Sequence, residues 1–116
     1  MISMSKEIAP EAAYEQMRVH CLAKPGVTED HPWGDVAWKR GKKAFVFGGE
    51  GSANFTLKST PDRQSALVLH PKIRAAAYVG RFGWVTIQAS DEETLALAKD
   101  LADESFDLVG PRRKSR

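Results

Sequence analysis

The chain has 116 residues, of which 42% are hydrophobic and 28% charged, and its 17 Lys and Arg against 15 Asp and Glu give a formal net charge of +2. This length and the ordinary glycine and proline contents exclude two independent cores, collagen-like repeats and wholly disordered chains. Apolar runs are too short for a membrane span, Cys21 is the only cysteine, and the first ten residues lack the apolar core of a signal peptide, so we expect a cytoplasmic protein.

The first periodic segment covers residues 10–23 and is predicted to be a helix. Ala13, Met17 and Cys21 recur at four-residue steps, which places them on one apolar helical face. Glycine and proline follow this segment and end the helix. We expect residues 27–34 to be irregular.

From residue 35 onward the apolar period changes to two, which is typical of β-strands. The β-rich runs are residues 35–40, 43–48 and 52–58, and short glycine-bearing turns separate them. Because such short turns cannot make a parallel crossover, the three runs form an antiparallel meander. Apolar and polar side chains alternate in the third run, so one sheet face is core and the other, with Lys58, is wet.

A short helix and a second strand region follow. Thr60 fits the N-cap of the helix and Pro61 its first position, and a later proline stops it. The strand region spans residues 75–89, in which strands at 78–79 and 84–88 bracket a glycine-bearing turn.

The last predicted element is a long acidic helix, where Ser90 and Glu93 fit a capping box. The order is helix, three strands, short helix, two strands and helix. Helices on one face of an antiparallel sheet make an α+β two-layer sandwich. We expect a single domain over residues 10–110, an N-terminal arm at 1–9 and a basic disordered tail at 111–116.

Catalytic and metal-binding constellations are missing from the sequence. His20 cannot act as a base for Cys21, because neighbouring helical residues point about 100° apart, and a buried structural role is favoured for this thiol. The three histidines lie in separate elements without the spacing of zinc ligands. The acidic residues of the last helix are more typical of a solvated face than of an acid and base pair. We predict no enzymatic activity, no catalytic residue, no metal and no cofactor.

The small net charge conceals a strong segregation along the chain. Residues 1–35 hold three basic and six acidic side chains, residues 36–88 nine and two, residues 89–109 one and seven, and the tail four basic ones. Basic side chains gather at predicted turns, where they suit a phosphate backbone, and the nearby aromatic rings of Trp38, Phe82 and Trp84 suit stacking on bases or sugars. Edge lysines that prevent strand aggregation and aromatic residues of the core are the open alternative.

Trp84 shares a strand face with Thr86 and Gln88, which places it with Lys58 on the open side of the sheet. If it is exposed there, it is a candidate recognition anchor for nucleic acid or protein, and a Trp covered by a loop or the tail is the alternative. Seven residues are the candidate nucleic-acid contacts, six of them basic: Lys39, Arg40, Lys42, Lys43, Lys58, Arg81 and Trp84.

The sequence also resembles the MmcQ/YjbR family over residues 14–109. The resemblance rests on motifs that occur in order: Cys21 to Val27 with Glu29, Pro32-Trp33-Gly34, Trp38-Lys39, Lys43-Ala44-Phe45, Phe55 to Lys58, Pro61, Ala77 to Arg81, Gly83-Trp84-Val85 and Glu104 to Val109. It implies a CyaY-like (frataxin-like) fold and a DNA-binding protein with a double-wing motif. The wings would fall on residues 41–51 and 80–83, and the basic tail departs from the family pattern.

We therefore expect a non-enzymatic protein that binds DNA through basic hairpin wings, mainly by phosphate contacts, and that is a monomer or weak dimer. The alternative is a protein-interaction or small-ligand-binding module that uses the open sheet face around Trp84.

Overall fold

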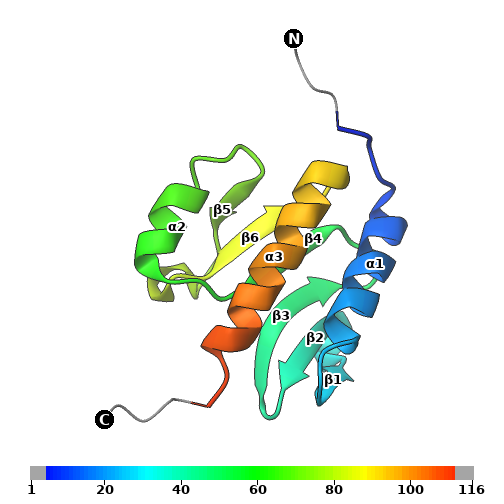
Figure 1. Ribbon diagram of the computed structural model, residues 1–116, viewed down its shortest axis with the longest axis vertical. Helices are drawn as coiled ribbons and strands as arrows, with labels where there is room; N and C mark the ends of the chain where they lie inside the picture. The colour runs from blue at the N-terminus through cyan, green and yellow to red at the C-terminus, as the bar shows by residue number, and fades with distance from the viewer. Residues whose placement is uncertain (1–4, 112–116) are drawn as a thin grey trace.

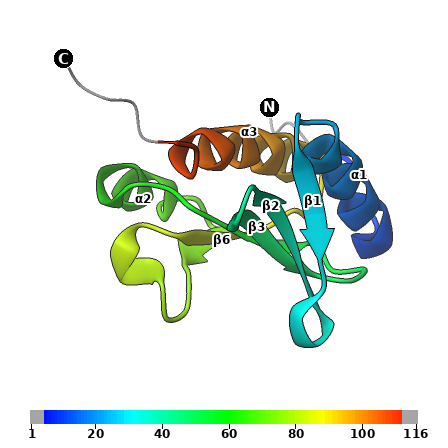
Figure 2. The same cartoon turned by 90° about the horizontal axis from the view of Figure 1, so that it is seen from below.

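The computed structural model describes residues 5–111, which form a six-stranded sheet with helices packed on one of its faces (Figures 1 and 2). The elements in chain order are α1 (Pro10–Leu22), β1 (Val27–Asp30), the 3-10 turn η1 (Pro32–Gly34), β2 (Asp35–Arg40), β3 (Lys43–Gly49), β4 (Asn54–Leu57), α2 (Pro61–Leu67), β5 (Ile73–Ala75), the 3-10 turn η2 (Gly80–Phe82), β6 (Val85–Gln88) and α3 (Glu92–Leu108). The sheet order is β1-β2-β3-β4-β6-β5, with every pair antiparallel. The predicted α+β two-layer architecture is confirmed.

The core lies between the sheet and the two long helices, α1 and α3 (Figure 2). α1 contributes Met17 and Cys21, which are fully buried and lie on the predicted apolar face. β2 and β4 contribute Trp38 and Phe55, whose ring centroids lie 6.3 Å apart. Burial of large side chains of this kind is the main favourable contribution to folding.

The first strand of the sheet, β1, corrects the prediction that residues 27–34 are irregular. β1 pairs with β2 from Val27 opposite Arg40 to Asp30 opposite Ala37. It is an edge strand with two acidic residues and shows little apolar alternation, and such a strand is held by backbone hydrogen bonds that leave no hydrophobic signature.

The connection between β5 and β6 corrects a second prediction. Tyr78 and Val79 do not form a strand; the strand before β6 is β5, earlier in the chain. Tyr78 has a φ of 68°, a left-handed conformation that extended backbone does not permit. The predicted turn at residues 80–83 is the 3-10 turn η2, which begins directly after Val79.

α3 begins one residue later than its predicted capping box at Ser90 and Glu93. The Asp91 carboxylate accepts a bond of 2.8 Å from the Thr94 N–H, and the Thr94 hydroxyl accepts one of 3.1 Å from the Asp91 N–H. The described part of the predicted arm lies beside this cap, since the Glu92 N–H donates to the Lys6 carbonyl at 2.9 Å. Residues 1–4 of the arm and 112–116 of the predicted tail lie outside the described residues.

Candidate nucleic-acid interface

An open hollow of about 1010 Å³ lies at the C-terminal end of α3, and we call it the basic hollow. Its first wall is the β2–β3 turn, where Gly41 takes a φ of 64°, and its second wall is residues 107–111. Four of the seven predicted contact residues line it: Arg40, Lys42, Lys43 and Lys58. The segments that carry these residues are separate in the sequence, and the antiparallel pairing of β2, β3 and β4 brings them together.

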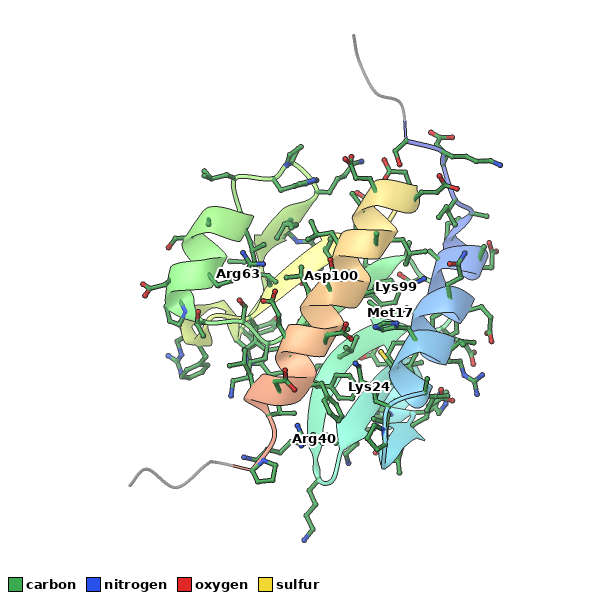
Figure 3. All side chains as sticks on the ribbon, viewed as in Figure 1. Met17, Lys24, Arg40, Arg63, Lys99 and Asp100 are labelled. Carbon is green, nitrogen blue, oxygen red and sulfur yellow. The ribbon has the colours of Figure 1, made fainter. Side chains whose placement is uncertain are left out.

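Arg40 lines the basic hollow and contacts the end of α3. Its guanidinium donates to the Phe106 carbonyl at 2.9 Å and lies 4.2 Å from the centroid of the Phe106 ring. A cation at this place satisfies a carbonyl of the last helical turn and interacts favourably with the negative end of the helix dipole. Figure 3 shows Arg40 between the end of α3 and the β2–β3 turn. One N–H donor and one face of its guanidinium are thus engaged within the protein.

The three lysines of the basic hollow supply positive charge that is free to bind a ligand. Among the described residues, no ion pair involves Lys42, Lys43 or Lys58. Ser105 fixes the backbone beneath them, since its hydroxyl accepts from the Lys58 N–H at 2.9 Å and donates to the Phe45 carbonyl at 2.6 Å. Asp107 is the single acidic residue in the lining. The hollow is therefore rigid at its base and strongly positive.

Lys39 does not join this group. Alternation along β2 directs it to the face opposite Arg40, and its ammonium lies 3.7 Å from an Asp30 carboxylate oxygen on β1. Its charge is partly offset by that carboxylate. It is not among the residues that line the basic hollow.

Arg81 lies on η2 and is not among the residues that line the basic hollow. Its guanidinium lies 4.8 Å from the centroid of the Phe82 ring. Gly83 (φ 97°) packs against the backbone of Ser59 and Thr60, where an added Cβ would approach the Ser59 carbonyl to 2.6 Å. This close backbone contact joins η2 to the segment that follows Lys58.

Trp84 lies with Phe47 on the sheet face opposite the helices, which we call the uncovered face. The two ring centroids are 5.8 Å apart. A shallow hollow of about 330 Å³ on this face is lined by Phe47, Thr56 and Thr86, among others. Lys58, which was expected on this face beside Trp84, is among the residues that line the basic hollow.

Two connections project from the uncovered side of the sheet (Figure 2): the β1–β2 connection, residues 31–34, and the β5–β6 connection, residues 76–84. Trp33 is 99% exposed at the first and Tyr78 is 98% exposed at the second. They are also the two non-glycine residues of the described chain with positive φ, at 47° and 68°. Neither was singled out as a site residue from the sequence, because exposure and backbone conformation leave no signature there beyond the glycine that follows Trp33.

A hydrogen-bonded carboxylate, that of Glu29 in β1, anchors the first connection. It accepts bonds from Arg18 Nε at 2.8 Å, Trp38 Nε1 at 2.9 Å and His31 Nε2 at 2.9 Å. Burial alone would raise the pKa of Glu29, but the bonds from Trp38, His31 and Arg18 outweigh it and hold the pKa at about 2. Glu29 is thus ionised and structural.

The groups weighed for catalysis, Cys21 and His20, lie in different surroundings. Burial raises the pKa of the Cys21 thiol to about 12, so it stays protonated. His20 bonds to Asp103 at 2.8 Å and not to Cys21. Within residues 5–111, no group of His, Cys, Asp or Glu side chains is arranged to hold a metal ion, and no helix is long and apolar enough to cross a membrane.

Comparison with known proteins identifies relatives of the fold. Residues 22–108 match the family model described as YjbR. The crystal structure of protein DR2400 from Deinococcus radiodurans, described as a DUF419 domain, is similar with a TM-score of 0.71 and 21% sequence identity, over 86% of this chain and 80% of that chain. At that identity the likeness shows the fold alone. No curated protein matches the sequence.

Proposed function

The chain belongs to the YjbR family, and from this premise we propose that it is a non-enzymatic protein that binds nucleic acid, in the first instance DNA, by its phosphates. The observation that carries the proposal is the basic hollow, in which Lys42, Lys43 and Lys58 converge without an acidic partner among the described ion pairs. The single buried cysteine suits a reducing compartment, the cytoplasm.

The chemistry of the basic hollow favours a phosphate backbone over base edges. Lysine is a compact point charge that neutralises phosphate without the bidentate geometry that reads bases. Arg40, whose planar group could read a guanine edge, is bonded to Phe106. The protein should therefore bind nucleic acid with little sequence preference, driven by release of counterions.

Fluorescence anisotropy with a labelled duplex at low salt tests this function. The double variant Lys42→Glu/Lys43→Glu should abolish binding. The matched control is Lys6→Glu/Lys99→Glu, which changes the net charge equally at positions away from the basic hollow and should keep most of the affinity. Undetectable binding by the wild-type protein, or equal losses in both variants, overturns the proposal.

A protein-interaction role of the uncovered face is the second candidate. It is favoured by the Phe47–Trp84 pair, because Phe47 is a large apolar side chain left exposed in the middle of a sheet. The simplest partner is a second copy of the chain, consistent with the expected monomer or weak dimer. Sedimentation velocity should then show self-association that Phe47→Glu removes and Lys42→Glu/Lys43→Glu leaves unchanged. A monomer at all concentrations contradicts it.

A further inference from the structure

We infer that the β5–β6 connection is a stacking platform for unpaired bases, so that the protein prefers single-stranded nucleic acid to duplex. This inference rests on the proposed function, since the phosphates of the same strand would lie in the basic hollow. It assigns a role to Tyr78 and Phe82, two aromatic side chains that neither the core nor the basic hollow uses.

Both aromatic side chains are presented to solvent. Tyr78 is 98% exposed and Phe82 55% exposed, within five residues of one another. Tyr78 holds a φ of 68°, a conformation that is uncommon for a bulky residue and that the folded structure must impose. Exposed aromatic rings are the platforms on which single-stranded nucleic acids stack, because every base has a π-face.

The platform is held rigidly against the body of the protein. The Gln64 side-chain amide on α2 donates to the Gly80 carbonyl at 2.7 Å and to the Trp84 carbonyl at 2.9 Å. Within the turn, the Phe82 N–H donates to the Val79 carbonyl at 3.0 Å. A platform ordered before binding loses little conformational freedom when a base stacks on it.

The charge around the platform suits a polyanion. From Pro71 to Ser90 the chain has three basic residues, Lys72, Arg74 and Arg81, and no acidic one. Among the described residues, none of the three takes part in an ion pair.

The backbone beside the platform contacts the segment that follows Lys58. Gly83 follows Phe82 directly and packs against Ser59 and Thr60, and Lys58, which lines the basic hollow, is the next residue back along the chain. A strand whose phosphates contact Lys58 and that continues along Ser59 and Thr60 would reach η2. In a duplex the faces of the bases are stacked on one another, so only an unpaired segment can use the aromatic rings.

Three probes of equal length and label test the inference by anisotropy: a deoxyadenosine strand, an abasic strand with the same phosphates, and a duplex. The wild-type protein should bind the deoxyadenosine strand at least about 10-fold more tightly than the abasic strand, and also more tightly than the duplex. In Tyr78→Asn/Phe82→Ser this preference should disappear while duplex affinity stays. Asparagine is chosen because it tolerates the left-handed backbone, and circular dichroism verifies the fold.

The matched control is Trp33→Asn, which removes an equally exposed aromatic residue with positive φ from the other connection and should keep the preference. Equal binding of all three probes, with loss in Lys42→Glu/Lys43→Glu, overturns the stacking platform and leaves the proposed function standing. A preference that survives in Tyr78→Asn/Phe82→Ser, or that Trp33→Asn also abolishes, overturns the platform too. Failure of every probe to bind at low salt overturns both.

Discussion

The β1–β2 and β5–β6 connections project from the same side of the sheet (Figure 2) and present one aromatic residue each in a left-handed conformation. Their surroundings differ in charge. Trp33 lies between Asp30 and Asp35 in sequence, whereas Tyr78 lies between Arg74 and Arg81. An acidic setting repels phosphate and a basic one attracts it. An exposed aromatic residue therefore indicates a binding role only together with the charges around it.

The two connections also differ in what holds them. The first depends on the ionised carboxylate of Glu29, which reaches back to α1 and β2. The second depends on the neutral amide of Gln64, which donates to the carbonyl of the first residue of η2, Gly80, and to that of Trp84 after it. The following substitutions should separate these two kinds of anchor.

Glu29→Ala should have the largest effect, a loss of about 2 kcal/mol in the free energy of unfolding, because it leaves the buried indole N–H of Trp38 without a partner. Urea denaturation followed by Trp fluorescence measures the change. A loss below about 0.5 kcal/mol would mean that the Glu29 network does not hold the first connection.

Gln64→Ala should cost about 1 kcal/mol, since the Gly80 and Trp84 carbonyls each lose one of two donors and keep a backbone N–H. It should also weaken binding of the deoxyadenosine strand while leaving duplex binding intact, because the platform loses its order. Urea denaturation and anisotropy on the same preparation measure both effects. An unchanged preference for the deoxyadenosine strand over the duplex would show that the Gln64 bonds are not needed for binding.

Acid should weaken the first connection before the second. The folded pKa of Glu29, about 2, is below its ordinary value of 4.5, so its contribution is fully present above pH 4.5 and is lost as the pH falls towards 2. Stability measured across this range should fall by about 1–2 kcal/mol more in the wild-type protein than in Glu29→Gln. Parallel curves for the two proteins would contradict the assignment.

Glycine at either tip should have the smallest effect. In Trp33→Gly and Tyr78→Gly, relief of the left-handed conformation offsets the greater freedom of the unfolded chain, so stability should change by less than about 0.5 kcal/mol. Thermal unfolding of both variants measures this. A clear destabilisation in either would show that the aromatic residue packs against the protein rather than serving a ligand.

Much of the fold could be predicted from the sequence, because periodicity reports burial directly. The α1 stripe of Ala13, Met17 and Cys21 and the alternation in β4 lie as expected. β1 could not be predicted, since an edge strand needs only backbone partners. Tyr78 could not be excluded from a strand, because tyrosine favours strands and only the packing of the turn imposes its positive φ.

The sequence could indicate which basic residues belong to the candidate site, but only part of how they are arranged. The count of basic residues selected Arg40, Lys42, Lys43 and Lys58, which antiparallel pairing brings together at one end of the sheet. The sequence could not show that Arg40 bonds to Phe106, or that Lys39 lies near Asp30, because both partners come from other elements.

The most direct test of the central claim is the slope of log K against log salt for a labelled duplex. If Lys42, Lys43, Lys58 and Arg81 each neutralise one phosphate, the slope for the wild-type protein should be about −3.6. Lys42→Ala/Lys43→Ala should reduce its magnitude by about 1.8. A slope that the double substitution leaves unchanged would contradict phosphate binding in the basic hollow.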